Sequence, residues 1–421
     1  MYLSRLSLTD FRSYREAELT LQPGVTTFIG LNGQGKTNLI EAAGYLASFG
    51  SHRVSSDAPL IRQGADRAIL RGVIVTAGRD SLLEIEINAG RANRVRLNRS
   101  PVARPREALG LLRCVLFAPE DITVVKGDPE QRRRYLDDLL VTLRPRYAGV
   151  RADYERAVRQ RTALLKSAKA RGGVPAGTLE VWDDHLVAAG AELTAGRLRL
   201  VAELRVLVTA SYSAVSGTER DTALRYRMAA VHTIASERDD WPGAGPATAE
   251  PPADNGDPEP DPGKLALILR EALGLRRRAE FERAVCLVGP HRDELELQIG
   301  GLPARGYASH GESWSLALAL RLAAYRLVRS SGEDPVLMLD DVFAELDATR
   351  RERLATLVAD AEQVLVTAAV PADVPASLSG VRFNVTDGTV LRVRVRGPVT
   401  TTRRPGEWRV RGGRGPRDTY G

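Results

Sequence analysis

The sequence predicts an α/β fold in which a lobe of mixed β-sheets surrounds a glycine-rich loop and a mainly helical second lobe is inserted into the chain. Three observations support this prediction. Alternating apolar and polar residues, typical of strands, occupy residues 1–118 and return after residue 285. Residues 125–235 instead show the spacing of helices. A glycine-rich pattern also lies between an early apolar run and a helix-like segment.

Changes in composition divide the chain further. With 421 residues, it is longer than one compact core requires. We expect residues 1–118 and 285–398 to form the strand-rich lobe and residues 119–284 to form the helical lobe. Residues 239–263 contain seven acidic residues, seven prolines and no Lys or Arg, which predicts a disordered insert within the helical lobe. Residues 399–421 predict a flexible basic tail.

Composition also excludes several classes of protein. Cys114 and Cys286 lie in apolar runs, which indicates buried free thiols rather than a disulfide framework. The five His residues show no metal-ligand spacing, so a zinc site is not expected. The longest apolar run, 316–320, is too short for a membrane span, and the N-terminal segment lacks the apolar core of a signal peptide. We therefore expect a cytoplasmic protein without membrane contact. Its formal charge of +7 points only weakly to a polyanionic partner.

The most specific motif follows the apolar run 25–29 and fits the pattern G-x-x-x-x-G-K-[S/T]. Its residues are Gly30, Leu31, Asn32, Gly33, Gln34, Gly35, Lys36 and Thr37. In such a P-loop, backbone N–H groups surround phosphates at the positive end of the following helix. We expect the whole motif to bind ATP, with Lys36 on the β- and γ-phosphates and the Thr37 hydroxyl on Mg²⁺.

A second apolar run, at residues 336–339, ends in two carboxylates. We expect Asp340 to be the Walker B ligand of Mg²⁺ and Asp341 to polarise the attacking water, so that Asp341 and Lys36 are the catalytic candidates. Without the P-loop, a buried strand that runs into a helix cap would be the favoured explanation of this run. Asp347 lies six residues beyond Asp341 and is the predicted D-loop residue.

Ser309 and Gly311 precede an apolar helix and lie 31 and 29 residues before Asp340. A serine hydroxyl, backbone N–H groups and a helix N-terminus together form a site for a γ-phosphate. In ATP-binding-cassette (ABC) ATPases, these residues form the signature motif, which binds the ATP held by the other subunit. Alone, the pattern would indicate only a capped helix. Combined with the P-loop, it predicts an ABC-type ATPase head that forms an ATP-dependent homodimer.

Taken together, these motifs resemble those of the RecF family of recombination-repair ATPases, relatives of the Rad50 and SMC heads. The resemblance covers nearly the whole chain except the acidic insert and the tail. The segments that carry it, besides the P-loop and the signature, are DFRSY (10–14), SHR (51–53), residues 117–140, GPHRDEL (289–295) and LDDVFAELD (339–347).

The resemblance implies a weak ATPase of DNA repair, replication and the SOS response. It implies binding to duplex DNA, single-strand gaps and single-strand/duplex junctions, joint action with RecR and RecO, and assistance to RecA loading. It also suggests a role for Arg132, Arg133 and Arg134 in DNA binding. A run of arginines more often marks a solvated face, and these arginines could also form ion pairs with acidic residues between the lobes.

Two departures from ABC transporters are visible. Asp341 stands where transporters usually have Glu, and Thr367 or Ala368 stands where they have a switch His. Both departures predict slow turnover, as in a timed clamp. A transporter ATPase subunit remains an alternative that would require a membrane partner. An SMC-like chromosome-organising head is a second alternative, but the helical region lacks a long heptad pattern.

Overall fold

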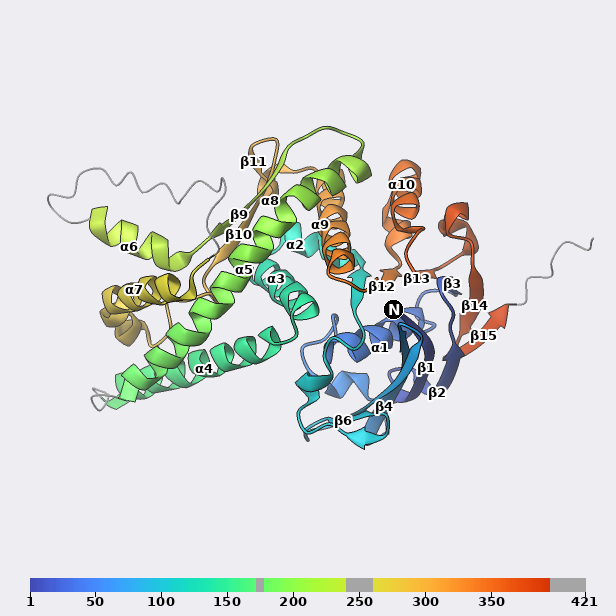
Figure 1. Cartoon of the computed structure of the whole chain (residues 1–421), viewed down its shortest axis with the longest axis horizontal. Coiled ribbons are helices and arrows are strands. Elements are labelled where there is room, and N and C mark those ends of the chain that lie inside the picture. The colour runs from blue at the N-terminus through green and yellow to red at the C-terminus, as the bar shows by residue number, and fades with distance from the viewer. Residues whose placement is uncertain (172–177, 240–259, 394–421) are drawn as a thin grey trace, which may run out of the picture.

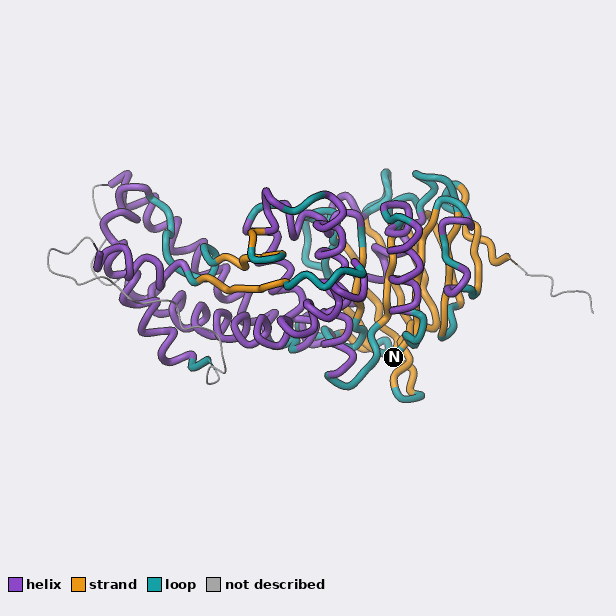
Figure 2. Tube along the Cα trace, turned by 90° about the horizontal axis from the view of Figure 1, so that it is seen from above, coloured by secondary structure: helices purple, strands orange, loops and turns teal. Residues whose placement is uncertain are grey.

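The computed structural model describes residues 1–171, 178–239 and 260–393. Most strands gather in one half of the elongated molecule and most helices in the other (Figure 1). Seen from above, one short group of strands lies among the helices (Figure 2). The predicted α/β fold is confirmed.

A six-stranded, mostly parallel sheet is the centre of the strand-rich lobe. Its order is β15-β14-β3-β13-β12-β8, and only β15 runs antiparallel to its neighbour. The strands β12 and β13 are buried over their whole lengths, as expected for near-continuous apolar runs in a parallel sheet. The bounds are β3 (Gly24–Ile29), β8 (Cys114–Phe117), β12 (Val336–Asp340), β13 (Gln363–Ala368), β14 (Val381–Thr386) and β15 (Thr389–Val393).

An antiparallel sheet of six strands faces the parallel sheet across helix α1 (Lys36–Ser48). Its strands carry the alternating pattern seen in the sequence, with one face in a core cluster shared with α1. Their order is β2-β1-β4-β5-β6-β7. The bounds are β1 (Tyr2–Phe11), β2 (Tyr14–Thr20), β4 (Arg67–Thr76), β5 (Arg79–Asn88), β6 (Arg94–Leu97) and β7 (Ser100–Pro101).

The helical lobe continues the core on the other face of the parallel sheet. Along β12, Val336 and Met338 belong to the core around α1, whereas Leu337 and Leu339 join the cluster of the helical lobe. The α-helices that follow α1 along the described chain, not all of them in the helical lobe, are α2 (Ile122–Lys126), α3 (Pro129–Leu143), α4 (Tyr147–Arg171), α5 (Thr178–Ser216), α6 (Ala229–Asp239), α7 (Pro262–Arg283), α8 (Ala304–Tyr307), α9 (His310–Ser330) and α10 (Ala348–Val358).

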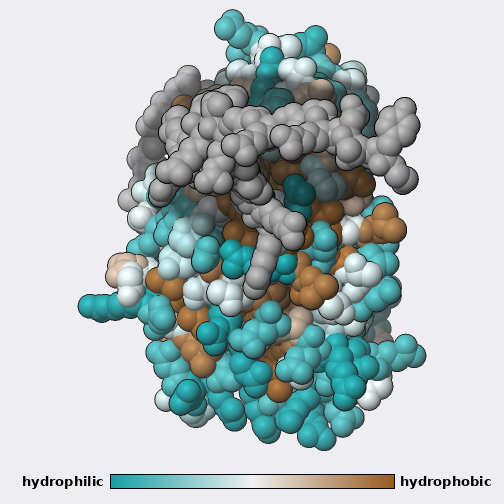
Figure 3. All heavy atoms as spheres, turned by 90° about the vertical axis from the view of Figure 1, so that its right-hand side faces the viewer, coloured by the Kyte–Doolittle hydropathy of each residue, from teal (hydrophilic) through white to brown (hydrophobic). Residues whose placement is uncertain are grey.

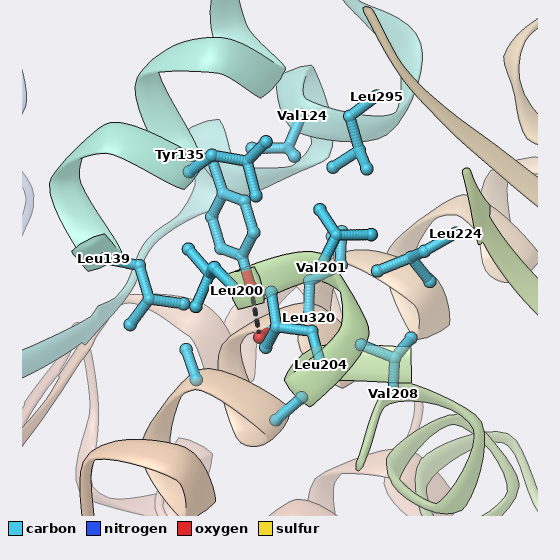
Figure 4. Packing of buried hydrophobic residues seen from close by; sticks show 14 of the residues in the cluster. Val124, Tyr135, Leu139, Leu200, Val201, Leu204, Val208, Leu224, Leu295 and Leu320 are labelled. Carbon is cyan, nitrogen blue, oxygen red and sulfur yellow. Dashed lines mark hydrogen bonds between the residues drawn. The ribbon is translucent and has the colours of Figure 1, made fainter. Parts of the chain in front are cut away.

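Figure 4 shows the centre of this second core, where leucines and valines of α3, α5, β9 and β10 surround Tyr135. The Tyr135 hydroxyl donates a hydrogen bond of 2.8 Å to the backbone carbonyl of Leu320 on α9. The buried phenol is thereby satisfied, and α3 is fixed against α9.

The structure corrects some boundaries. The apolar run 285–289, with which the strand pattern returns, predicts a strand, but none forms there. The next strand, β10 (Glu294–Ile299), pairs with β9 (Thr222–Arg227) and β11 (Leu302–Pro303) among the helices. Cross-strand pairing therefore places β10 with the helical lobe, although the sequence suggests the other lobe.

The edges of the predicted acidic insert are helical rather than disordered. The helix α6 ends at Asp239, and Asp261 caps α7 by accepting a hydrogen bond from the Gly263 N–H at 2.8 Å. Residues 240–259 and the predicted basic tail lie outside the described residues. Both cysteines are free thiols, with Cys286 buried and Cys114 half-buried. In the described parts of the chain, every helix is too short or too polar to cross a membrane.

Candidate nucleotide-binding site

The P-loop connects β3 to α1 and depends on two glycines for its course. At Gly30, a Cβ atom would lie 2.2 Å from the carbonyl oxygen of Val385 on β14, so a side chain cannot be accommodated. Gly35 has a φ of +105°, and a Cβ there would lie 2.9 Å from both the Ser13 and Tyr14 oxygens. The loop therefore passes between β14 and the β1–β2 turn, which positions it tightly at the end of the parallel sheet.

Hydrogen bonds brace the same loop from both sides. The Tyr14 hydroxyl donates to the Gly35 carbonyl at 3.0 Å, and the Gln34 side chain accepts from the Asp387 N–H at 2.5 Å. No described side chain caps the N-terminus of α1, and the first turn of this helix carries no acidic residue. The positive end of the helix is therefore available to an anion.

The single lysine of the loop is buried, with 3% of its side chain exposed. Lys36 Nζ donates to the Leu31 carbonyl and to Asn32 Oδ1, each at 3.3 Å, and lies 3.8 Å from Asp341 Oδ2. The two hydrogen-bond acceptors are neutral and their bonds are long, and the one carboxylate partner, Asp341, lies at the outer limit of an ion pair. A phosphate group would supply stronger acceptors at the same place, so the residues present fit a nucleotide.

Asp340 ends β12 and is held by two hydroxyls. Thr37 Oγ1 donates to Asp340 Oδ1 at 3.0 Å, and Thr367 Oγ1 donates to the same oxygen at 2.6 Å. Burial, together with the nearby Asp341 carboxylate, raises the pKa of Asp340 to about 6. A divalent cation would offset this desolvation. The Thr37 and Asp340 oxygens suit Mg²⁺, which usually takes one or two protein ligands plus phosphate oxygens and water.

Asp341 adopts a left-handed backbone conformation, with φ of 50°, directly after the strand. Its N–H donates to Thr367 Oγ1 at 2.8 Å, so the Thr367 hydroxyl links the backbone of one Walker B acid to the carboxylate of the other. Thr367 is one of the two residues, with Ala368, that the sequence places where transporters carry the switch His. The sequence indicates this absence, but it gives no sign that the threonine would fix both acids.

The predicted signature residues lie at the start of α9. Ser309 is the N-cap: its hydroxyl accepts from the Glu312 N–H at 3.2 Å, while Glu312 Oε2 accepts from the Ser309 N–H at 2.8 Å. This capping box fixes the helix terminus. Ser309 is exposed and Gly311 is half-buried, so the terminus can be approached from outside the chain.

The predicted D-loop residue is joined to the signature helix by an arginine that the sequence does not single out. Asp347 caps α10 and accepts from the Arg350 N–H at 2.9 Å. Arg350 Nε donates to Ser315 Oγ on α9 at 3.0 Å, and its guanidinium lies beside Gly311. The spacing of Asp347 and Arg350 predicts a helix cap, but nothing in the sequence predicts the contact with α9.

A buried carboxylate on α1 ties together two of the segments that carry the family resemblance. Glu41 is fully buried; Arg12 donates to both of its oxygens, at 2.8 and 2.6 Å, and Ser51 donates to one at 2.5 Å. Burial alone would raise the pKa of Glu41, but the hydrogen bonds from Arg12 and Ser51 lower it below the usual value. The segments 10–14 and 51–53 are thus fixed to the helix that follows the P-loop.

A second carboxylate joins the parallel sheet to the signature helix. Asp121 Oδ1 accepts from Arg321 Nε and Nη2 on α9, at 2.9 and 2.6 Å. Asp121 Oδ2 accepts from the Ala118 N–H at 2.9 Å, just after β8. A shift of α9 would therefore be transmitted to the end of β8, beside the strand that carries Asp340.

The three arginines proposed as DNA contacts differ in accessibility. Arg132 is buried: its Nε and Nη2 donate to Glu294 on β10 at 2.7 and 3.0 Å, and its Nη1 donates to two backbone carbonyls. Arg133 is half-buried and donates to the Asp293 carbonyl at 2.8 Å, while Arg134 is exposed. Arg134 Nη2 also donates to the Ser51 carbonyl at 3.0 Å. Arg132 therefore positions α3, and DNA contact by Arg133 or Arg134 stays a prediction.

Replacing Arg132 with alanine is expected to lower the free energy of unfolding by about 2–3 kcal/mol, because Glu294 loses its partner in a largely buried place. The expected value is lower than for a fully buried pair because 18% of the Glu294 side chain is exposed. The control, Arg134→Ala, should change stability by less than about 1 kcal/mol, since its pair with Asp138 is exposed. Urea denaturation measures both variants, and equal losses would contradict the positioning role.

Comparisons with known proteins show the family of the chain. Residues 2–382 match the family model described as the RecF/RecN/SMC N terminal domain. The chain is 56% identical over 407 residues to the DNA replication and repair protein RecF of Kineococcus radiotolerans, covering 93% of this chain and 100% of that protein. It is 54% identical over 398 residues to the protein of the same name from Streptomyces avermitilis, with coverage of 93% and 100%.

Solved structures show the same relationship. The recombination mediator protein RecF-ATP in the RecFOR pathway superposes with a TM-score of 0.79 at 26% identity, over 93% of this chain and 98% of that one. An SMC head bound to the C-winged helix domain of ScpA shares the fold alone, with a TM-score of 0.51 and 16% identity. The sequence of its site, its fold and these relatives together show that the chain belongs to the RecF family of DNA replication and repair proteins.

Proposed function

We propose that this chain is an ATP-dependent DNA-binding protein of recombinational repair and replication restart, and a slow ATPase. The observation that carries the proposal is the pair of Walker motifs joined through Asp340, which receives hydrogen bonds from both Thr37 and Thr367. This arrangement brings the phosphate loop and the metal carboxylate together from positions 303 residues apart. The RecF names of the relatives and the ATP named for a related structure support the same function.

In the proposed mechanism, the P-loop would bind the phosphates of ATP, and Thr37 and Asp340 would hold Mg²⁺. The ion would supply charge neutralisation of the phosphates. Lys36 shifts from its loop acceptors onto the phosphates, and Asp341 orients the attacking water. The departure of Lys36 from Asp341 leaves that carboxylate free to accept a hydrogen bond.

The exposed signature helix completes the site in trans. Ser309 and Gly311 of one chain would receive the γ-phosphate of ATP bound to the P-loop of another, so each ATP stabilises a homodimer. Arg350, which bonds α9 and pairs with Asp347, would then couple the signature to the D-loop at the same interface. ATP would close the dimer on DNA at gaps and single-strand/duplex junctions, and hydrolysis would release it.

The RecF family also gives the cellular context of the proposal. The chain would act in the cytoplasm with RecR and RecO and assist RecA in replacing single-strand-binding protein. The alternative, a transporter ATPase subunit, would need a membrane partner. No observation among the described residues favours it.

The proposal predicts a dimeric ATPase that responds to DNA. Sedimentation with ATP should shift the chain from monomer to dimer, and gapped duplex DNA should raise the rate of phosphate release. ADP in place of ATP is the control and should leave the chain monomeric. A chain that stays monomeric with ATP, or whose hydrolysis is indifferent to gapped DNA, would contradict the proposal.

A further inference from the structure

A basic surface unrelated to the predicted run 132–134 lies on the strand-rich lobe. Residues 91–106 contain six arginines and no acidic residue, and all six are exposed. We call this segment, which includes β6 and β7, the arginine hairpin. Hydrophilic side chains crowd the lower end of the molecule in Figure 3, the end where Figure 1 places β6. Its arginines are Arg91, Arg94, Arg96, Arg99, Arg104 and Arg106.

The charge of the arginine hairpin is largely uncompensated. Along β6, Val95 points into the core, so Arg94 and Arg96 share the outer face of the sheet. Arg94 lies 3.8 Å from Glu86, but Arg67 of β4 lies closer to the same carboxylate, at 3.5 Å. Arg96 lies opposite Glu84 of β5, but that carboxylate pairs with Arg71 at 2.9 Å. Within the described residues, the five arginines other than Arg94 form no ion pair.

The tip of the hairpin holds an arginine in a strained conformation. Asn98 and Arg99 connect β6 to β7 and have φ values of 50° and 71°. A two-residue turn with two positive φ angles strongly favours Asn-Gly, because glycine adopts this conformation without steric cost. Arg99 occupies the glycine position. Strain of this kind is concentrated at functional sites, which suggests that the side chain is kept for what it binds.

The tip is also rigid. Asn98 exchanges two hydrogen bonds with Leu82 of β5: its N–H donates to the Leu82 carbonyl at 2.8 Å, and its Oδ1 accepts from the Leu82 N–H at 2.9 Å. At the base of the hairpin, Asn93 Nδ2 donates to Asp57 Oδ2 at 2.6 Å and to the hydroxyl of Tyr45 on α1 at 3.0 Å. The arginines are thus presented on a fixed support, which lowers the entropy lost on binding, and the support is bonded to the ATP-binding helix.

From these observations, we propose that the arginine hairpin binds the phosphate backbone of duplex DNA. Arginine presents a planar fork that matches phosphate oxygens, and phosphate contacts position a protein on DNA without reading its sequence. The hairpin contains no aromatic residue on which unpaired bases could stack, which favours duplex over single-stranded DNA. The proposal rests on the DNA-binding function proposed above and names the surface that would contact the DNA. An acidic protein partner is the competing occupant.

The test compares two sets of three Arg→Gln substitutions in the full-length chain. The hairpin variant carries Arg96→Gln, Arg99→Gln and Arg104→Gln. The control variant carries Arg156→Gln, Arg159→Gln and Arg278→Gln, which remove the same charge from exposed helical positions that do have carboxylate partners. Fluorescence anisotropy measures the affinity for a labelled duplex and for a labelled single strand, with ATP, over a series of salt concentrations.

We expect the hairpin variant to bind the duplex at least 10-fold more weakly than the control does, with a smaller salt dependence. The slope of log K against log[salt] should fall by about 0.9 for each phosphate that the variant no longer neutralises. ATP binding, measured with a fluorescent analogue, should not change. Equal duplex affinity and equal slope in the two variants, or a loss confined to the single strand, would overturn the proposal and leave the proposed function standing.

A wild-type chain that binds no DNA would instead refute the proposed function, and the hairpin proposal with it. A single substitution separates binding from folding. Arg99→Gly removes the strain at the tip, so the melting temperature should equal or exceed that of the wild type while duplex affinity falls. Unchanged duplex affinity in this well-folded variant would count against a phosphate contact by Arg99.

Discussion

Replacing Lys36 with methionine is expected to abolish ATP binding and, with it, ATP-dependent dimerisation and DNA retention. The methionine keeps much of the apolar volume of the lysine but removes the cation that donates to the P-loop acceptors Leu31 and Asn32. Without this charge, the loop would bind the phosphates mainly through its backbone N–H groups. A loss of at least 100-fold in ATP affinity corresponds to about 2.7 kcal/mol, a reasonable value for a charge-assisted contact.

The matched control is Lys166→Met, the same chemical change at an exposed position of α4. Isothermal titration with Mg²⁺-ATP and retention of gapped DNA on a filter measure the two properties separately. The control should behave like the wild type in both. If Lys36→Met loses ATP but retains DNA to the same extent as the wild type, ATP does not control DNA retention and the clamp mechanism fails.

Replacing Asp341 with asparagine should have the opposite effect on the dimer. The amide has the size of the carboxylate but cannot polarise water as a base, so hydrolysis should slow by about 10²–10⁴-fold. ATP binding should persist, because Lys36, Thr37 and Asp340 are unchanged. The dimer formed with ATP should therefore live longer, and DNA should dissociate more slowly.

Phosphate release and the lifetime of the ATP dimer test this expectation together. Asp138→Asn, at an exposed position of α3, is the control and should change neither quantity. An Asp341→Asn chain that remains monomeric with ATP would show that this carboxylate acts in assembly rather than in hydrolysis.

The sequence predicts those parts of the site whose chemistry depends on local spacing. The P-loop, the strand that ends at Asp340 and the helix start at Ser309 are each specified by consecutive residues, and the structure places each on the expected element. Contacts between distant segments leave no such pattern. Thr367 contacts Asp340 because β13 lies beside β12, and Arg350 reaches Ser315 because α10 packs near α9.

The arginines show the same limit of prediction from sequence, because their exposure depends on contacts with distant segments. The run 132–134 stands out in the sequence by its charge, yet its first member is buried against Glu294 on β10, a strand far along the chain. The six arginines of residues 91–106 are spread among apolar and small residues, so the sequence does not indicate that they form one basic surface. Their common exposure becomes visible only when β6 and β7 are placed at one edge of the antiparallel sheet. Burial and pairing, rather than charge density, separate the two groups.

The order of strands in the parallel sheet has a consequence for synthesis on the ribosome. Gly24 of β3 pairs with Gln363 of β13, which is made 339 residues later, whereas the antiparallel sheet uses only residues within the first 101. At a synthesis rate of about 5–20 residues per second, β3 leaves the ribosome on the order of tens of seconds before β13 does. The edge of β3 that later pairs with β13 stays unpaired during this delay. Nascent chains are therefore expected to need chaperone protection until β13 emerges, and truncation before it should yield insoluble protein.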